Sequence, residues 1–163
     1  MTLPMKDNAP ITPLRPALKN VVELLMKNLT LREIAAPSAM AYETVRGYVR
    51  EVRAALNCPP RCKLHVIVHM ALAAGQIAPP TTLRPVPDLD AQQQLLLTAI
   101  ATHSTRYEMA RAAKIAPVDL WPAVDALLRD TGAAHVMELV VLGHSWGLLG
   151  AQEPDTVKGE ADQ

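Results

Sequence analysis

Three arginines, Arg46, Arg50 and Arg53, follow one another at spacings of four and three residues within the segment Tyr42–Leu56. This spacing places all three on one face of a helix, opposite the apolar residues of the same segment. A guanidinium group can bind a phosphate, or the O6 and N7 atoms of guanine, through two hydrogen bonds. The arginines therefore predict a helix that contacts double-stranded DNA, although a run of charges is also typical of an ordinary solvated helix face.

Residues beside the arginines suit the same chemistry. Tyr42 and Thr44 lie at the start of the segment, where they can add contacts to phosphates or bases. Gly47 lies between Arg46 and Arg50, and a glycine inside a helix costs about 1 kcal/mol relative to alanine. Close approach of the helix to DNA is one reason to keep a glycine there.

Two cysteines and two histidines within twelve residues, Cys58, Cys62, His65 and His69, are all ligand types that zinc prefers. The last three are expected on one helix, and one rigid helix cannot surround a tetrahedral ion. Structural zinc sites usually combine pairs of ligands from separate elements. We therefore expect neither a metal ion nor another cofactor, and we interpret these side chains as structural.

A further candidate for chemistry is Gly143-His144-Ser145-Trp146-Gly147, which has the spacing of a nucleophile elbow. A hydrolase of that kind needs an acid and a histidine that follow the serine in the chain, and no histidine follows Ser145. The residues ahead of the motif show no alternation of strands and helices. We therefore expect that the protein is not an enzyme.

The elements that must position these residues are short helices whose apolar pattern occurs twice. Residues 16–54 align with residues 91–129 at an offset of 75 without a gap, so that Thr30 matches Thr105. Gly75 and Gly147 then match at an offset of 72, which leaves three extra residues in the first copy. A register kept over such a span indicates two copies of one small helical unit.

Apolar spacing, capping residues and prolines predict an all-α fold with four helices in each copy. Capping-box spacing at Thr30 and Thr105 marks two of the helix starts. The expected helices are one from Leu14, one from Thr30 to near Ala36, Tyr42–Leu56, Lys63–Ala74, and then helices near Asp90–Thr102, Thr105–Ala113, Val118–Asp130 and Val136–Leu142 or beyond. Residues 78–87 contain four prolines and predict a semi-rigid linker. We thus predict two tandem units, at 14–77 and 88–150, with flexible tails at 1–13 and 151–163.

The first copy also resembles a known DNA-binding family. The resemblance is carried by four stretches at their mutual separations: Leu29-Thr30-Leu31-Arg32-Glu33-Ile34-Ala35, Met40-Ala41-Tyr42-Glu43-Thr44-Val45-Arg46-Gly47-Tyr48-Val49, Leu56-Asn57 with Arg61, and Ala71-Leu72-Ala73-Ala74-Gly75-Gln76-Ile77. Together they resemble the LuxR/FixJ-type helix-turn-helix, a four-helix domain of many bacterial transcription regulators, over residues 16–77. Sigma-factor region 4 shares the Glu-Ile-Ala and Thr-Val-Arg blocks. The sequence departs from the family pattern at Pro37 and Ser38, and its fourth helix has three extra residues.

This resemblance implies that Arg46, Gly47 and Arg50 face bases in the major groove and that Tyr48 touches phosphate. The complete set of expected DNA contacts is Thr30, Tyr42, Thr44, Arg46, Gly47, Tyr48, Arg50 and Arg53.

The second copy keeps the apolar pattern but not these contacts. The offset of 75 places different side chains at the three positions expected to face bases: Trp121, Pro122 and Asp125. Charge differs as well, since residues 1–87 carry eleven Lys and Arg against five Asp and Glu, and residues 88–163 carry five against eleven. Phosphate repels an acidic unit, whereas Trp121 offers a large apolar face. We therefore expect Trp121 and Asp125 to contact protein; the alternative is that Trp121 packs against the first unit.

Two features of the whole sequence limit the class of protein that it can be. No apolar run approaches the ~18 residues of a membrane-spanning helix, and residues 1–16 have no apolar stretch of the signal-peptide type. We expect a cytoplasmic protein without membrane contact. The sequence predicts a sequence-specific transcription regulator that binds double-stranded DNA as a homodimer, with RNA polymerase or another regulator as a further partner. The alternative is an adaptor that binds a sigma factor or another regulator and never contacts DNA.

Overall fold

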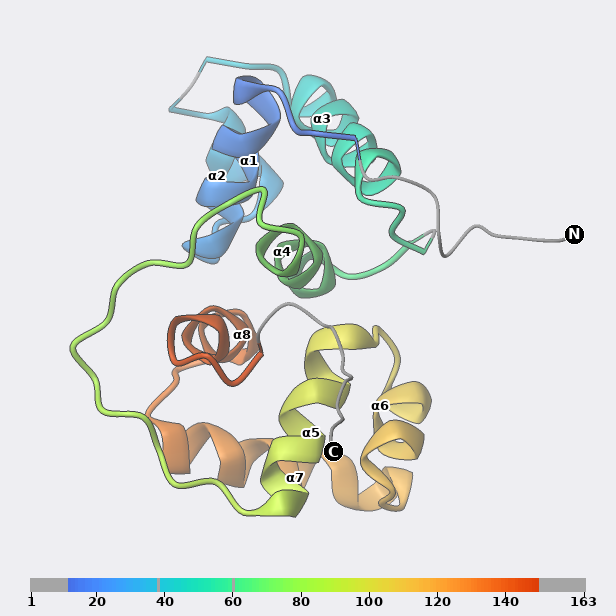
Figure 1. Ribbon diagram of the computed structural model, residues 1–163. Coiled ribbons are helices and arrows are strands. Elements are labelled where there is room, and N and C mark those ends of the chain that lie inside the picture. Colours follow the sequence, from blue (N-terminus) through green and yellow to red (C-terminus); the bar gives the residue numbers. More distant parts are fainter. Residues whose placement is uncertain (1–11, 38, 60, 150–163) are drawn as a thin grey trace, which may run out of the picture.

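The computed structural model describes residues 12–37, 39–59 and 61–149. Within these residues the chain forms eight α-helices and no β-strand (Figure 1). Their bounds are α1 Pro16–Met26, α2 Leu31–Ala35, α3 Tyr42–Ala55, α4 Leu64–Ala73, α5 Ala91–Thr102, α6 Arg106–Ala113, α7 Pro117–Thr131 and α8 Val136–Ser145. The expected all-α class is confirmed, and each helix lies close to its expected position. The expected tails lie outside the described residues, apart from residues 12 and 13.

Helices α1 to α4 enclose one cluster of buried apolar side chains. Pro16 begins α1, where its missing N–H has no helical partner to lose and its fixed backbone angle suits a helix. The inward faces of α1 and α3 are buried at helical spacing, at Leu18, Val21, Leu25, Val45, Val49 and Val52. The apolar periodicity of the sequence therefore decides which face of α3 is left outside.

The short helix α2 is constrained at both ends. The Glu33 N–H donates to Thr30 Oγ1 (3.1 Å) and the Thr30 N–H donates to Glu33 Oε1 (2.8 Å), which completes the expected capping box. The helix ends at Ala35, two residues before Pro37, because proline has no N–H and its ring clashes with a continuing helix. These two constraints fix how the chain enters α3, against which α2 packs.

Helices α5 to α8 enclose a second buried cluster. Thr105 caps α6 by accepting the Glu108 N–H (3.2 Å), which is the half of the expected capping box that the described residues form. Pro122 is the sixth residue of α7, so the carbonyl of Val118 has no N–H to accept from that position. The helix continues to Thr131 nevertheless.

Helix positions repeat at the offsets of the apolar register. Helices α5, α6 and α7 begin 75 residues after α1, α2 and α3, and α8 begins 72 residues after α4. The N-cap residues Thr30 and Thr105 match at the same offset of 75. The local signals that start each helix therefore act at matched positions in the two halves of the chain.

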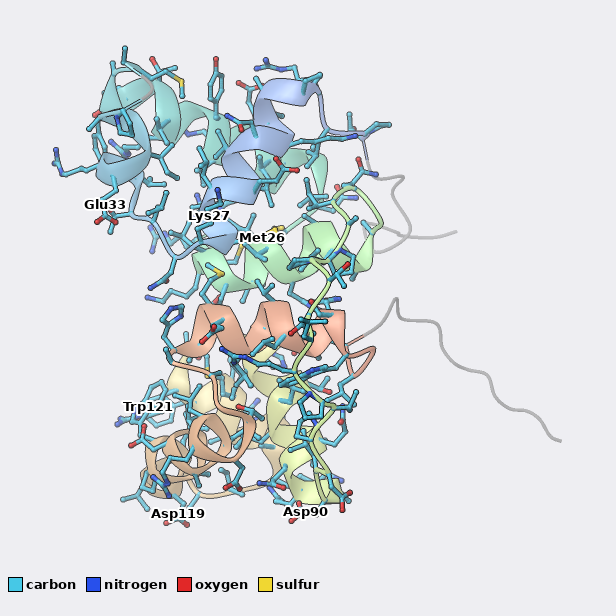
Figure 2. All side chains as sticks on the ribbon, turned by 90° about the vertical axis from the view of Figure 1, so that its left-hand side faces the viewer. Met26, Lys27, Glu33, Asp90, Asp119 and Trp121 are labelled. Carbon is cyan, nitrogen blue, oxygen red and sulfur yellow. The ribbon has the colours of Figure 1, made fainter. Side chains whose placement is uncertain are left out.

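The two halves meet where α4 lies beside α8, at the centre of the molecule (Figures 1 and 2). Met137 and Val141 of α8 belong to the buried cluster of the N-terminal helices. At the same contact, the buried rings of His69 and His144 share a hydrogen bond of 2.8 Å between Nδ1 and Nε2. The N-terminal helices therefore do not complete their core without α8.

The segment between α4 and α5 is not helical, and it is fastened to α8 and the residue after it. The Ser145 hydroxyl donates to the Pro80 carbonyl (2.6 Å). The indole Nε1 of Trp146 donates to the Arg84 carbonyl (3.1 Å). These bonds hold the proline-containing segment in place at two points.

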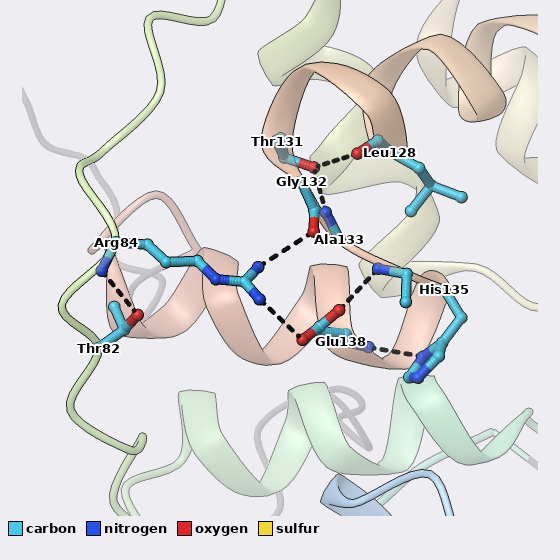
Figure 3. A network of polar contacts seen from close by, with 9 residues as sticks. Thr82, Arg84, Leu128, Thr131, Gly132, Ala133, His135 and Glu138 are labelled. Atoms are coloured by element: carbon cyan, nitrogen blue, oxygen red, sulfur yellow. Dashed lines mark hydrogen bonds and ion pairs between the residues drawn. The ribbon is translucent and has the colours of Figure 1, made fainter.

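The Arg84 side chain adds a third attachment. Its Nη1 donates to the Gly132 carbonyl (3.1 Å), and its Nη2 lies 3.5 Å from Glu138 Oε2 (Figure 3). Glu138 in turn accepts the Ala134 N–H (2.6 Å) and donates its own N–H to His135 Nδ1 (3.1 Å). Arg84 thus joins the connecting segment to the turn between α7 and α8.

Candidate nucleic-acid interface

The face of α3 opposite its buried valines carries two of the three expected arginines in exposed positions. The buried face packs against α1 and α2. Arg46 and Arg50 lie on the other side, one helical turn apart, and both are exposed. Both are therefore available to a partner outside the chain.

An aromatic ring joins α2 to α3 at the start of α3. The guanidinium carbon of Arg32 lies 4.3 Å from the centre of the Tyr42 ring, and that of Arg46 lies 5.9 Å from it. The negative face of the ring attracts both cations, by about 0.5–1 kcal/mol for an exposed pair. Tyr42 thus gathers two cations at one place. Arg32 was not among the expected DNA contacts. In the sequence, the only indication of such a role is its position directly before Glu33, in the capping-box segment of α2.

Gly47 and Arg50 have few constraints from the rest of the protein. Within the described part of the chain, no hydrogen bond or ion pair holds the Arg50 guanidinium. Apart from the backbone of its own helix, a Cβ atom added to Gly47 meets no heavy atom of the described residues within 4 Å, and the residue does not have a positive φ. Neither packing nor backbone geometry therefore requires glycine at this position of the helix, where alanine is intrinsically favoured.

Carboxylates hold two cations of this region in place. Arg46 Nη1 lies 3.2 Å from Glu43 Oε1, and the two side chains are 47% and 73% exposed. Arg15 Nη2 binds Glu51 Oε1 (2.9 Å), and the guanidinium lies 5.3 Å from the centre of the Tyr48 ring. Exposed pairs of this kind contribute about 0–1 kcal/mol each, so a phosphate can replace either carboxylate at small cost.

Arg53 differs from the other two arginines. Its side chain is half-buried, and its Nη2 donates to the Cys62 carbonyl (3.0 Å) in the loop that follows α3. The structure thus gives Arg53 a partner inside the chain, whereas Arg50 has none among the described residues. A role for Arg53 in DNA contact stays a prediction.

The two expected threonine contacts are placed differently. The Thr30 hydroxyl already accepts a hydrogen bond as the cap of α2, which leaves its own hydrogen and one lone pair for a partner outside the chain. Thr44 is exposed in the first turn of α3. Thr44 is therefore the freer of the two.

The C-terminal helices expose three large apolar side chains, and α7 carries Trp121 and Asp125 at the positions that match Arg46 and Arg50. Tyr107, Val118 and Trp121 are 61%, 80% and 47% exposed. Figure 2 places Trp121 and Asp119 on the same side of the molecule as Glu33 of α2. A partner bound to that side can therefore meet both halves of the chain.

Trp121 also borders a groove between the two halves. The groove has a volume of about 480 Å³, and Lys63 and His65 from the N-terminal half line it together with Trp121 and Met109. Trp121 is thus neither buried against the N-terminal helices nor fully free of them. Asp125, the other expected partner contact, is exposed one turn along α7.

The four side chains of zinc-ligand type lie in three separate places. Cys58 and Cys62 both lie beside Arg53: the Cys58 N–H donates to the Arg53 carbonyl (2.9 Å), and the Cys62 carbonyl accepts from Arg53 Nη2 (3.0 Å). His65 Nε2 bonds a backbone carbonyl of α5 (2.9 Å), and His69 bonds His144. In the part of the chain that the structure describes, no three Cys, His, Asp or Glu side chains gather closely enough to hold a metal ion.

Burial sets the charge of the histidine pair at the contact between α4 and α8. It lowers the pKa of His69 to about 4, with a smaller effect from the charge of His65. Burial likewise lowers the pKa of His144 to about 4, with a smaller effect from His69. Both rings are therefore neutral near pH 7, and one can donate to the other.

The motif with the spacing of a nucleophile elbow has structural roles. Ser145 lies at the end of α8, not after a strand, and its hydroxyl donates to the Pro80 carbonyl. A Cβ atom on Gly143 would lie 2.6 Å from Leu149 Cδ1, so only glycine fits without displacing Leu149. Gly147 has a φ of 76°, which glycine adopts most easily. Helix ending and close packing thus account for both glycines.

Comparisons with known proteins leave the chain without a match. No model of a protein family matches the sequence, and no curated protein or solved structure matches it at a significant level. The likeness to the LuxR-type domain therefore rests on the motif residues alone. Among the described residues, no helix is long and apolar enough to cross a membrane.

Proposed function

We propose that this protein is a cytoplasmic transcription regulator that binds double-stranded DNA through α3. Residues 14–77 form the DNA-binding unit of a tandem pair of helix-turn-helix units, residues 88–150 form the diverged second unit, and the proline-containing segment links them. The observation that carries the proposal is the pair of exposed arginines, Arg46 and Arg50, on either side of Gly47. Among the described residues, no atom outside the backbone of α3 fills the space beside that glycine, and a major groove admits a helix with such a face.

Each residue of the face suits a particular contact. Arg46 and Arg50 can reach base edges with bidentate geometry, because both lie on the exposed side one turn apart. Arg32, held against Tyr42, suits a phosphate at the start of the helix. When DNA binds, Arg46 leaves Glu43 and contacts DNA. The free-energy cost of breaking the ion pair is small because the pair is exposed.

In the second unit, the exposed side chains of Tyr107, Val118 and Trp121 contact protein. Three exposed large apolar side chains in α6 and α7 favour such a role, and the carboxylates of Asp119 and Asp125 disfavour phosphate. The partner is a second copy of this chain. A homodimer presents two α3 helices to two half-sites, and linked binding then raises the affinity for paired sites.

The same exposed apolar side chains support a second candidate function, that of an adaptor which binds a sigma factor, RNA polymerase or another regulator without touching DNA. Salt dependence separates the two functions. Binding to phosphates releases counterions, so the affinity of a DNA-binding protein falls steeply as salt rises. An adaptor shows no such binding to duplex DNA.

The test uses the full chain and a fluorescently labelled duplex chosen by selection from a random pool. Fluorescence anisotropy is measured over a range of salt concentrations for the wild type, Arg46→Ala and Arg50→Ala. Each substitution is expected to cost about 1–3 kcal/mol of binding at the selected site. The control is Arg129→Ala, which removes an exposed arginine from α7.

Two results would contradict the proposal. The absence of salt-dependent binding to any duplex would favour the adaptor. Equal losses from Arg129→Ala and Arg50→Ala would show that the protein attracts DNA through its general charge and not through α3. The dimer is tested separately by sedimentation equilibrium, where Trp121→Ser is expected to shift the chain toward the monomer.

A further inference from the structure

The groove that Trp121 borders is held in shape by two hydrogen bonds between the halves of the chain. The Lys63 N–H donates to Ser104 Oγ (2.9 Å), and His65 Nε2 donates to the Ile100 carbonyl (2.9 Å). These four residues all line the groove, so its walls are joined before any ligand arrives. Its volume of about 480 Å³ lies within the range of roughly 300–1,000 Å³ that is typical of small-molecule sites.

Apolar side chains from four helices line this groove. Ile100 of α5 and Met109 of α6 belong to the buried cluster of the C-terminal helices, so they form its floor. Val136 of α8 is half-buried and Trp121 of α7 is 47% exposed, so these two side chains offer surface that a ligand can touch. An indole ring packs well against another aromatic ring, and the groove therefore suits a flat apolar group.

The charged residues of the lining are two cations, Lys63 and Arg106, and both are exposed. No carboxylate is among the described residues that line the groove, although residues 88–163 carry eleven Asp and Glu against five Lys and Arg. Within the described part of the chain neither cation has an ion pair, and Arg106 Nη2 donates only to the Tyr107 hydroxyl (2.9 Å). Burial lowers the pKa of His65, so its ring is neutral near pH 7 and the positive charge comes from the two cations. The groove therefore favours a ligand with a negative charge beside its apolar group.

We propose that this groove binds a small aromatic carboxylate. The aromatic ring of the ligand lies against Trp121 and Val136, and its carboxylate accepts hydrogen bonds from Arg106 and Lys63. The planar guanidinium of Arg106 can bind both carboxylate oxygens, whereas the Lys63 ammonium adds a single charge. Lys63 belongs to the N-terminal half and Arg106 to the C-terminal half, so the bound ligand joins the two halves of the chain.

This inference does not rest on DNA binding, because the ligand is titrated into the protein alone. The probe is cinnamate, and cinnamamide is an uncharged control of nearly the same shape. Isothermal titration calorimetry on the full chain is expected to give one site per chain, with a Kd for cinnamate on the order of 0.1–1 mM, as suits so small a ligand. The amide is expected to bind about tenfold more weakly, because its hydrogen bonds to the two cations lack the charge of a carboxylate.

Variants at exposed positions test which residues bind the carboxylate. Arg106→Gln and Lys63→Gln should each weaken cinnamate binding about fivefold, because an exposed ion pair is lost, and should leave the affinity for the amide nearly unchanged. Arg111→Gln removes another exposed arginine of α6, outside the lining of the groove, and should bind cinnamate as the wild type does. Thr105→Asp keeps an N-cap residue for α6 but adds a carboxylate to the groove, so it should also weaken cinnamate binding about fivefold, whereas the uncharged cap in Thr105→Asn should not.

The proposal fails if cinnamate gives no heat of binding, or if the acid and the amide bind with equal affinity. Equal losses from Arg106→Gln and Arg111→Gln would show that cinnamate responds to the general charge of the protein and not to the groove. An unchanged affinity in Thr105→Asp would place the bound ligand elsewhere on the protein. The comparison of acid with amide uses the wild type alone, so it decides the question even if a variant does not fold.

Discussion

Substitution of Gly47 by alanine separates the stability of α3 from its proposed function, because the two are expected to change in opposite directions. Alanine adds one methyl group to the exposed face of the helix, between Arg46 and Arg50. In the part of the chain that the structure describes, no heavy atom outside the backbone of α3 lies within 4 Å of the Cβ position, so the methyl group meets open space. Folding therefore gains helix propensity without a steric cost.

The gain can be estimated from this geometry. Alanine is favoured over glycine inside a helix by about 1 kcal/mol, through a smaller loss of backbone freedom and better shielding of the backbone. For a chain of this size, a gain of about 1 kcal/mol raises the melting temperature by roughly 2–4 °C. If the helix approaches DNA closely at Gly47, the same methyl group occupies space that the groove needs. A tenfold loss of affinity then corresponds to ~1.4 kcal/mol.

The assay combines urea unfolding with fluorescence anisotropy on the selected duplex, at one salt concentration. Gly143→Ala is the matched control for the chemical change. It also replaces a helical glycine by alanine, but at a buried position where the new Cβ lies 2.6 Å from Leu149 Cδ1. Gly47→Ala should therefore raise stability and weaken DNA binding, whereas Gly143→Ala should lower stability.

Two outcomes would refute the reasoning in different ways. If Gly47→Ala lowers the free energy of unfolding, the face of α3 is not open as described. If stability rises and DNA affinity is unchanged, the helix does not approach DNA at Gly47, and the assignment of the recognition face is wrong even if the protein binds DNA elsewhere.

Three other predictions concern charge, acid and packing. Glu43→Gln removes a negative charge and releases Arg46 from its ion pair, so the affinity for DNA at low salt should rise about fivefold in the anisotropy assay. An unchanged affinity would show that the Glu43 carboxylate does not compete with phosphate for Arg46. The folded pKa of His69 and His144, about 4, lies below the unfolded value of 6.5, so the unfolded chain binds more protons between these pH values. The contribution of this pair to the free energy of unfolding is therefore fully present above pH 6.5 and falls by up to ~3 kcal/mol per histidine as the pH approaches 4. Urea unfolding at pH 7 and at pH 5 measures this loss. An equal free energy of unfolding at the two pH values would contradict the prediction. Gly143→Ala should cost about 1–3 kcal/mol by overpacking against Leu149, and an unchanged midpoint of urea unfolding would show that this side chain moves aside freely.

The sequence predicts the helices well because local signals start and stop them. The capping box at Thr30 and Glu33 and the proline at position 37 act within a few residues, so they can be recognised without knowledge of the fold. The repeat gives a second, independent indication of where the helices begin. The offset between the apolar residues of the two copies is also the offset between the first residues of matched helices.

Contacts between distant residues could not be predicted in the same way. His69 and His144 are separated by 75 residues, and nothing near either of them indicates that the two rings meet. Arg53 has the spacing of a helix-face arginine, yet its guanidinium bonds the loop carbonyl of Cys62 because the chain returns beside it. Spacing along the chain thus identifies the exposed face of α3, but the fold decides which of its arginines remain unengaged.

The attachment of Pro80 to Ser145 sets how far the two halves of the molecule can move apart. Ile77 still belongs to the buried cluster of the N-terminal helices, so only residues 78 and 79 lie between that core and the hydrogen bond. Two extended residues span at most ~7 Å, less than the width of one helix. If the contact between α4 and α8 opens, its two surfaces stay at a high effective concentration and meet again in a first-order step. Dilution therefore cannot separate them, and any opening of this contact should occur at the same rate at every protein concentration.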